Sequence, residues 1–339
     1  MRITGKSIMK ILIPLIIFIL LQNGLFAFEK VDSTNKNNSA VTDEKSYHPL
    51  SLLELKGNEY NFDKGIYKSQ TENNLVFDPF KTEIDYKILA GMGTVFIATG
   101  MAVHFYQQHA WWSTKRTKFH FQNDWAYALW IDKVGHFYGA LIIQHALSAG
   151  LEAANFQSRE STIYGALGSL AFQTFIEIED GFGPEWGFSP GDFYSDLLGS
   201  AYPVAQYYFP YLSNFQFRFS YIPKDLKGTN PITGQKHIIP DDYEGQKFWL
   251  SLKMENILPS SLSKFWPDFL MLSGGMGVKN LDGKGGGNRE WYIGFDFDAD
   301  QIPLYGKFWQ FVKNTLNYMH FPLPGIRISP GTKFFVFCF

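Results

Sequence analysis

The period of the hydrophobic pattern changes near residue 213, and this change constrains the fold more than any other feature. Between residues 84 and 212, long apolar runs with interspersed Gly, Ala and Ser predict helices that are buried or embedded in a membrane. From Phe215 onward apolar and polar residues alternate, as in Phe215–Tyr221, which predicts strands with one apolar face. Helices followed by strands indicate an α+β fold.

Four helices are predicted in the first region: residues 88–103, 125–155, 161–179 and 190–209. The first carries a ridge of small residues at four-residue spacing, which favours close packing against another helix: Ala90, Thr94, Ala98 and Ala102. Each apolar stretch is close to the ~20 residues that cross a bilayer. The four helices therefore fit either a membrane-embedded bundle or a compact water-soluble one, and hydropathy does not separate these alternatives.

The second region, residues 213–339, is predicted to form a small antiparallel β-sheet with one helix at Phe308–Met319. Turns rich in Gly, Asn and Pro separate five strand candidates: Phe215–Tyr221, Phe248–Met254, Phe269–Val278, Trp291–Phe297 and Lys333–Phe339. A closed membrane barrel has at least about eight strands. The expected arrangement is therefore a sheet that packs on the helices or lies on a membrane.

The N-terminal part of the chain has the pattern of an export signal followed by a polar arm. Basic residues precede the uncharged apolar run Ile11–Leu21, and Ala27 offers a small residue at a cleavage position. We therefore predict a signal peptide at residues 1–27, with an uncleaved anchor helix as the alternative. Residues 28–83 are predicted to be a polar arm, partly disordered, because Asp32–Ser39 lacks the apolar content to pack. In both cases the chain is exported, and we expect it in the cell envelope, associated with a membrane, in the periplasm or at the outer membrane.

The charge balance and the aromatic content limit the partners of the chain. Its 339 residues include 30 Lys and Arg against 32 Asp and Glu, a formal net charge of -2, whereas a nucleic-acid-binding protein needs a basic surplus. The Gly-rich segments lack the strand–turn–helix context of a phosphate-binding loop, so no nucleotide is expected either. Aromatic residues make up 18% of the chain, and several Trp and Tyr lie near predicted helix ends, as in membrane proteins. The expected partners are membrane lipid or envelope proteins.

Ionisable residues inside the predicted helices are the most informative side chains. Asp132 and His136 are four residues apart and share one face of the second helix. Lys133 lies one residue off that face, where it is placed to pair with an acid of a neighbouring helix. Glu177 lies at the end of the apolar run of the third helix, and Asp196 lies inside the fourth. Such groups are costly to bury unless they are paired, and inside a bilayer they indicate function.

The start of the fourth predicted helix has a structural explanation of its own. Ser189 suits the N-cap, Pro190 suits the first helical position, and Asp192 lies where an acid completes a capping box. We therefore predict Ser189 and Asp192 to be structural caps. Asp196 lies one turn deeper on the same face, and capping does not explain it.

The order of these motifs resembles that of two bacterial families. Asp-Lys-x-x-His-Phe, an acid closing the next helix, and Ser-x-x-Asp-x-x-x-Asp-x-x-Gly are similar to the YfiM-like family of predicted envelope lipoproteins, whose function is unknown. They are also similar to the VanZ-like family, which is linked to glycopeptide-antibiotic resistance. The matching positions are Asp132, Lys133, His136, Glu177, Ser189, Asp192, Asp196 and Gly199.

The resemblance covers residues 84–212, with weaker similarity at Asp242–Gln246 and in the segment after it. It implies a four-helix hydrophobic (VanZ-like) domain in the cell envelope, and no particular reaction. The chain departs from the lipoprotein pattern because its one cysteine, Cys338, is not placed for lipid attachment after the export signal.

Two hypotheses describe what the buried Asp/His/Glu cluster does. In the first, Asp132, His136, Glu177 and Asp196 bind a divalent metal such as zinc or manganese. The protein is then a metal-dependent hydrolase of an envelope lipid or cell-wall precursor, with Glu177 as general base. In the second, Asp132, His136 and Asp196 form a polar network that fixes helix register, and the protein has a structural or accessory role. The second is favoured because structural ion networks are commoner than catalytic sites, and it requires no cofactor.

A run of acids near the end of the fourth strand candidate is a weaker signal. Asp296, Asp298 and Asp300 alternate with Phe297 and Ala299, and a period of two places the three acids on one strand face. The stretch lacks the Gly and the closing Glu of a helix–loop–helix calcium loop. We therefore expect a solvated strand face.

Overall fold

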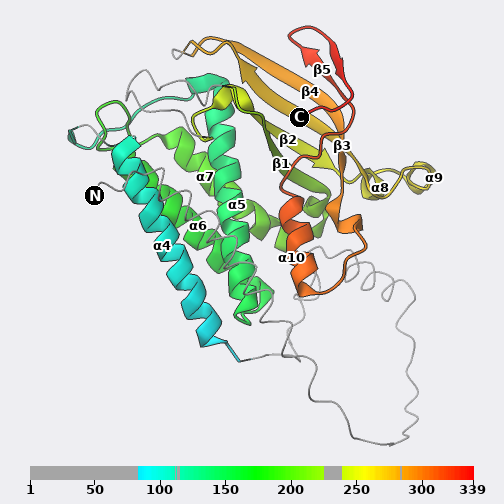
Figure 1. Cartoon of the computed structure of the whole chain (residues 1–339), viewed down its shortest axis with the longest axis horizontal. Helices are drawn as coiled ribbons and strands as arrows, with labels where there is room; N and C mark the ends of the chain where they lie inside the picture. The colour runs from blue at the N-terminus through cyan, green and yellow to red at the C-terminus, as the bar shows by residue number, and fades with distance from the viewer. Residues whose placement is uncertain (1–82, 111, 113–114, 225–238, 283–284) are drawn as a thin grey trace, which may run out of the picture.

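The computed structural model describes residues 83–110, 112, 115–224, 239–282 and 285–339. The predicted signal peptide at 1–27, and all but the last residue of the predicted arm at 28–83, lie outside these residues. Over the described residues the fold is α+β, with a group of long helices beside one antiparallel sheet (Figure 1).

The helices follow the apolar runs of the sequence. Their bounds are α4 Tyr86–Ala110, α5 Ile131–Ala153, α6 Ser158–Asp180, α7 Pro190–Tyr208 and α10 Lys307–Leu316, with two short helices, α8 Met254–Ile257 and α9 Ser260–Ser263. α5 begins later than predicted because Ala128, Leu129 and Trp130 have positive φ angles of 44°, 55° and 79°, outside the right-handed helical region.

α5, α6 and α7 pack closely against one another. At Gly199 on α7, a Cβ atom would overlap the carbonyl oxygen of Phe137 on α5, so the two backbones approach closely only because this residue is glycine. At Gly135 and Gly139 of α5 the nearest atoms to a Cβ belong to side chains, at 3.7 and 3.6 Å, so no backbone approaches as closely there.

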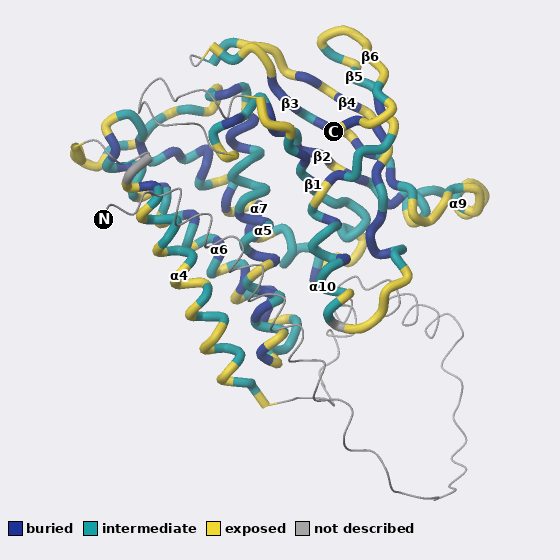
Figure 2. Tube along the Cα trace, in the orientation of Figure 1, coloured by how far each residue is buried: buried dark blue, intermediate teal, exposed yellow. Residues whose placement is uncertain are grey.

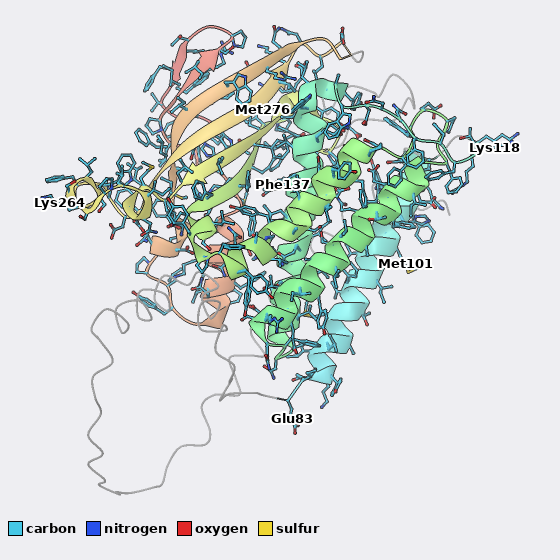
Figure 3. All side chains as sticks on the ribbon, turned by 180° about the vertical axis from the view of Figure 1, so that it is seen from behind. Glu83, Met101, Lys118, Phe137, Lys264 and Met276 are labelled. Carbon is cyan, nitrogen blue, oxygen red and sulfur yellow. The ribbon has the colours of Figure 1, made fainter. Side chains whose placement is uncertain are left out.

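α4 lies beside this group, and its described residues are exposed or half-buried, apart from buried Gln107 near its end (Figure 2). Within the part of the chain that the structure describes, its segment Tyr86–Gln108 is the one helix long and apolar enough to cross a membrane, by length and composition only. None of the 18-residue window that meets this test is buried. Met101, labelled in Figure 3, points away from the neighbouring helices and is 53% exposed.

The contact between α4 and its neighbours differs from the one expected. The small-residue ridge was predicted to pack against another helix, but Ala90, Thr94 and Ala98 are exposed. Aromatic rings make the contact with α6 instead, as shown by Phe96 and Phe172, whose ring centroids are 6.2 Å apart. The four-residue spacing correctly placed these small residues on one face of the helix, but that face is exposed rather than covered by another helix.

The sheet is a six-stranded antiparallel meander in which each strand pairs with its neighbours in the sequence. Its strands are β1 Phe215–Tyr221, β2 Gln246–Leu252, β3 Leu270–Lys279, β4 Asn288–Phe297, β5 Gly325–Ser329 and β6 Lys333–Phe335. Five of them correspond to predicted strands, whereas β5 was missed because its five residues are too few to establish a period. The segment after α10 covers the other edge of β1, where His320 N donates to Phe219 O at 2.9 Å.

The two faces of the sheet differ sharply in polarity. The face that we call the inner face carries buried polar side chains, among them Arg218, Ser251 and Asp296, and the ring of His320 stacks on Trp249 there at a centroid distance of 3.8 Å. The opposite, outer face is apolar. α5 covers its β1 side, and Phe137, labelled in Figure 3, packs on Phe217 of β1 with ring centroids 4.6 Å apart.

The three acids expected on a solvated face are buried, so that prediction was wrong. Asp296, Asp298 and Asp300 are 0%, 1% and 5% exposed. Arg218 Nη1 lies 2.9 Å from Asp296 Oδ1, and Lys253 Nζ lies 2.8 Å from Asp298 and 2.7 Å from Asp300. The alternation was real along β4, but the apolar residues of the strand form the outer face and the polar ones point inward. We define the inner ionic cluster as the buried charged residues of this region: Arg218, Lys253, Asp296, Asp298, Asp300 and Lys313, which lies beside the backbone of Asp300.

Candidate functional site

Lys133 on α5 is surrounded by three carboxylates. Its Nζ lies 2.7 Å from Asp124 Oδ2, 2.8 Å from Asp132 Oδ2 and 2.7 Å from Asp192 Oδ1. Lys133 donates hydrogen bonds to Asp124 and Asp132, and its contact with Asp192 is an ion pair. Burial alone would lower the pKa of Lys133, but the charges of Asp132 and Asp192 and the hydrogen bonds outweigh it and raise the pKa. Lys133 therefore pairs with an acid of α7, as its position in the sequence suggested.

His136, one turn further along α5, faces a second group of carboxylates. Its Nδ1 lies 3.2 Å from Asp196 Oδ1 on α7 and 3.8 Å from Glu177 Oε1 on α6, and its Nε2 lies 3.8 Å from Asp192 Oδ1. Asp196 also accepts a hydrogen bond from Gln173 Nε2 at 2.7 Å. The side chain of His136 is 24% exposed, whereas those of Glu177 and Asp196 are 2% and 0% exposed. The imidazole is therefore the part of this group nearest to solvent.

The first residues of α7 contact both the carboxylates around Lys133 and those around His136. Ser189 is its N-cap residue, and its Oγ accepts a hydrogen bond from Asp192 N at 3.1 Å. The backbone N–H of Ser189 donates to Glu177 Oε2 at 3.1 Å, while the carboxylate of Asp192 pairs with Lys133. The reciprocal bond of a capping box thus comes from the last turn of α6 rather than from α7 itself.

The site holds more acidic than basic groups. Five carboxyl groups (Asp124, Asp132, Glu177, Asp192 and Asp196) surround two basic groups, Lys133 and His136. With all of them ionised, the excess is three negative charges. The inner ionic cluster of the sheet is balanced by contrast, because three carboxylates there face three cations: Arg218, Lys253 and Lys313.

Burial and the charges of neighbouring groups together set the pKa values of the site. Burial raises the pKa of Glu177 to about 9 and that of Asp192 to about 7. Burial would lower the pKa of His136, but its hydrogen bond to Asp196 and the surrounding acids raise it well above the ordinary value. Burial would likewise raise the pKa of Asp132, yet the charges of His136 and Lys133 hold it below the ordinary value. A protonated imidazole beside a neutral Glu177 is therefore the stable arrangement near neutral pH.

The four residues predicted to bind a metal fall into two overlapping groups. Asp132, His136 and Asp192 form one, and His136, Glu177 and Asp196 form the other. Within each group, one ligand atom per residue lies within 4.8 Å of the others. The first group includes Asp192, which was predicted only as a cap. Mixed nitrogen and oxygen donors of this kind suit zinc or manganese.

Sequence reasoning missed three residues of the site. Asp124 has no spacing relationship to the motifs, because the fold alone brings it to Lys133. Gln173 lies four residues before Glu177 on α6, so helical spacing could have placed it on the same face. Tyr243 donates its hydroxyl hydrogen to Asp132 Oδ1 at 2.7 Å and links the helices to the β region. A signal for Tyr243 did exist, because it lies within Asp242–Gln246, the segment of weaker family similarity.

A family model described as a predicted periplasmic lipoprotein (DUF2279) matches residues 120–208. This stretch contains α5, α6, α7 and every residue of the site except Tyr243. No curated protein and no solved structure matches the chain. The match supports a bacterial envelope lipoprotein domain of unknown function in this part of the chain, and the protein is exported and associated with the cell envelope.

Proposed function

We propose that the protein is a membrane-associated accessory component of the cell envelope, held at a membrane through α4. The exposure of α4 carries this proposal: Tyr86–Gln108 is a 23-residue apolar segment, and none of its most apolar window is buried. At 1.5 Å per residue, such a helix matches the roughly 30 Å hydrocarbon core of a bilayer. Lipid would remove this surface from water, which nothing in the described part of the chain does.

Fractionation of cells tests the membrane association. The full chain should sediment with membranes, resist extraction by high salt and dissolve in detergent. Ile97 and Met101 are 61% and 53% exposed on α4, so the double variant Ile97→Lys/Met101→Lys should partition into the soluble fraction. Leu304→Lys, at a 37% exposed position just before α10, which lies apart from α4 (Figure 1), is the matched control and should stay with the membranes. Release of the wild-type chain by osmotic shock would contradict the proposal.

For the polar cluster we propose a structural role in fixing the register of α5, α6 and α7. Its bonds join all three helices: Lys133 to Asp192, His136 to Asp196, and Glu177 to the backbone of Ser189. On this proposal His136→Ala lowers the melting temperature, and any loss of a cellular phenotype follows from lost stability. A variant that melts like the wild type but abolishes the phenotype would refute the structural role.

We also propose that the likeness to the YfiM-like and VanZ-like families extends to a shared four-helix arrangement. In support, α4 to α7 account for the helices of residues 84–212, and the motif positions of the resemblance meet at one place between α5, α6 and α7. A structure of a VanZ-like protein in which the corresponding Asp, His and acidic residues lie apart would contradict this proposal.

A metal-dependent hydrolase acting on an envelope lipid or cell-wall precursor is the second candidate function. The observation that favours it is that ligand atoms of His136, Glu177 and Asp196 converge within 4.8 Å of one another, in a site with five carboxyl groups and two basic groups. A divalent cation would favour the ionised form of these carboxyl groups and offset their charge. Because Glu177 is 2% exposed and bonded to Ser189 N, its role would be that of a ligand rather than a general base.

Metal content and melting decide between the two candidates. If the site binds a metal, the purified protein contains one equivalent, and a chelator lowers its melting temperature. Asp196→Asn should abolish that binding, whereas Asp124→Asn, which alters a partner of Lys133 and of the Ser189 hydroxyl but no candidate ligand, should retain it. Protein without stoichiometric metal, and with unchanged melting in chelator, would exclude the hydrolase.

A further inference from the structure

The outer face of the sheet is apolar and exposed over β2 to β6, beyond the part that α5 covers. Its exposed large side chains are between 36% and 65% accessible: Leu250, Trp291, Ile293, Phe295, Ile328 and Phe334. Figure 2 shows exposed and buried residues alternating along β4. Scattered exposed apolar residues are ordinary, but a contiguous patch of this kind marks an interaction surface.

The strand register makes this patch continuous. Leu250 pairs with Gly274, Gly274 with Ile293, Ile293 with Ile326, and Ile326 with Phe334. These residues form one row across five strands, and neighbouring rows add Phe295 on one side and Trp291 on the other. Apart from Arg289, at one end of β4, the outward positions of β3 and β4 carry no charged side chain.

The polarity of the sheet is reversed relative to that of a sheet in water. An antiparallel sheet with one wet face normally turns its polar side chains outward and its apolar ones toward the core. Here the inner ionic cluster is buried, with Arg218 and Asp296 both 0% exposed, and the apolar side chains of the opposite face are exposed wherever α5 does not cover them. Strands that face lipid have this apolar-out, polar-in alternation. The reversal therefore indicates hydrocarbon, rather than water, outside the sheet.

Charges at one end of the sheet indicate the kind of surface. The pairing of Trp291 with Ser329 places the β5–β6 turn at the same end as the β3–β4 turn (Figure 1). Lys279, Arg289 and Lys333 are exposed there. The one exposed acid among the neighbouring described residues, Asp282, accepts a hydrogen bond from Gly286 N at 2.8 Å. A cationic border beside an apolar face complements the headgroups of anionic lipids.

We infer that the outer face of β2–β6 rests on a bilayer containing anionic lipid, with its apolar side chains among the acyl chains and the cationic end of the sheet at the headgroups. This inference rests on the proposed membrane association and adds a second contact surface to that of α4. A second copy of the chain would cover apolar area equally well, but it would bring its own cationic border to the interface.

A site-specific fluorophore tests which surface meets lipid. The full chain is prepared with Cys338→Ala and a single new cysteine, Ile293→Cys, carrying an environment-sensitive label. The matched control places the label at Leu304→Cys, which is comparably exposed but lies in the segment between Asp300 and α10. Both proteins are bound to vesicles of phosphatidylcholine and phosphatidylglycerol whose acyl chains carry bromine. The label at residue 293 should lose fluorescence, and the label at residue 304 should retain it.

The outcomes separate this inference from the proposed function. Vesicle flotation without quenching at residue 293 overturns the lipid-facing sheet and leaves the membrane association through α4 intact. A chain that does not float at all refutes the proposed function and the inference together. Disulfide-linked dimers of the unlabelled Ile293→Cys variant on the vesicles would assign the face to a second copy. Replacing phosphatidylglycerol by phosphatidylcholine, or introducing Arg289→Gln/Lys333→Gln, should reduce the quenching, and unchanged quenching would contradict the role of the cationic border.

Discussion

Lys133 Nζ on α5 lies 2.7 Å from Asp192 Oδ1 in the first turn of α7, with the Lys133 side chain only 5% exposed. The pair joins two helices whose backbones also meet at Gly199, one turn beyond Asp196. Two kinds of constraint thus act at one interface: a desolvated charge that needs its partners, and a glycine that allows the approach. Each constraint can be removed separately.

Replacing Lys133 by Met should cost about 3–5 kcal/mol of unfolding free energy, because three carboxylates then remain at a buried site without their shared cation. Arg116→Met is the control. Arg116 pairs with Glu179 at the surface and is 53% exposed, so its loss should cost less than about 1 kcal/mol. Chemical denaturation of the two variants measures the difference. Equal losses would show that the charges around Lys133 are solvated or already neutral.

Gly199→Ala should destabilise the protein by about 1–3 kcal/mol, because the new methyl group overlaps the Phe137 carbonyl and forces α5 and α7 apart. Gly135→Ala is the matched helical control. The nearest atom to its Cβ would be Phe248 Cζ at 3.7 Å, an ordinary contact, so better helix propensity should leave stability unchanged or slightly higher. Thermal melting of both variants is the measurement, and a tolerated Gly199→Ala would contradict the close approach.

The sequence predicted most of the helices and strands, because their periods are long and uninterrupted. The start of α5 escaped prediction since no local rule forces positive φ at Ala128, Leu129 and Trp130. The alternation at Asp296 identified a strand but assigned its polar side chains to solvent. The period of a strand does not show which of its faces is covered. The usual assumption that the polar side chains face solvent was wrong here.

The candidate site was predicted in part, because helical spacing brings some of its members together. Asp132 and His136 share a face by their i,i+4 relationship. Asp124 and Tyr243 reach the same place from segments outside α5 to α7, and no spacing rule relates them to the motifs. The link from Asp192 to Lys133, rather than back to the Ser189 backbone, also depends on where α5 lies beside α7.

Arg218 and Asp296 should show strong energetic coupling. Both side chains are 0% exposed, and Arg218 Nη1 lies 2.9 Å from Asp296 Oδ1. Arg218→Met leaves a buried carboxylate unpaired and should cost about 3–5 kcal/mol, whereas the double variant Arg218→Met/Asp296→Leu should recover much of that loss. A double-mutant cycle by denaturation measures the coupling. Additive losses would mean that the other partners of Asp296, Ser251 and His320, hold the carboxylate without the arginine.

His145 should make the protein less stable in mild acid. The side chain is 4% exposed, and burial lowers the pKa of His145 to about 4 from its ordinary 6.5. Between these two pH values the unfolded chain binds a proton that the folded chain excludes, so stability is complete above pH 6.5 and falls as the pH drops toward 4. Over the whole window the loss amounts to about 3 kcal/mol.

In His145→Gln this proton uptake is absent, while an amide remains to face Thr315 Oγ1, which lies 3.0 Å from Nε2 in the wild type. The measurement compares unfolding free energies at about pH 7.5 and about pH 4.5 for both proteins. The wild type should lose more stability than His145→Gln, and equal losses would show that His145 is protonated in the folded state.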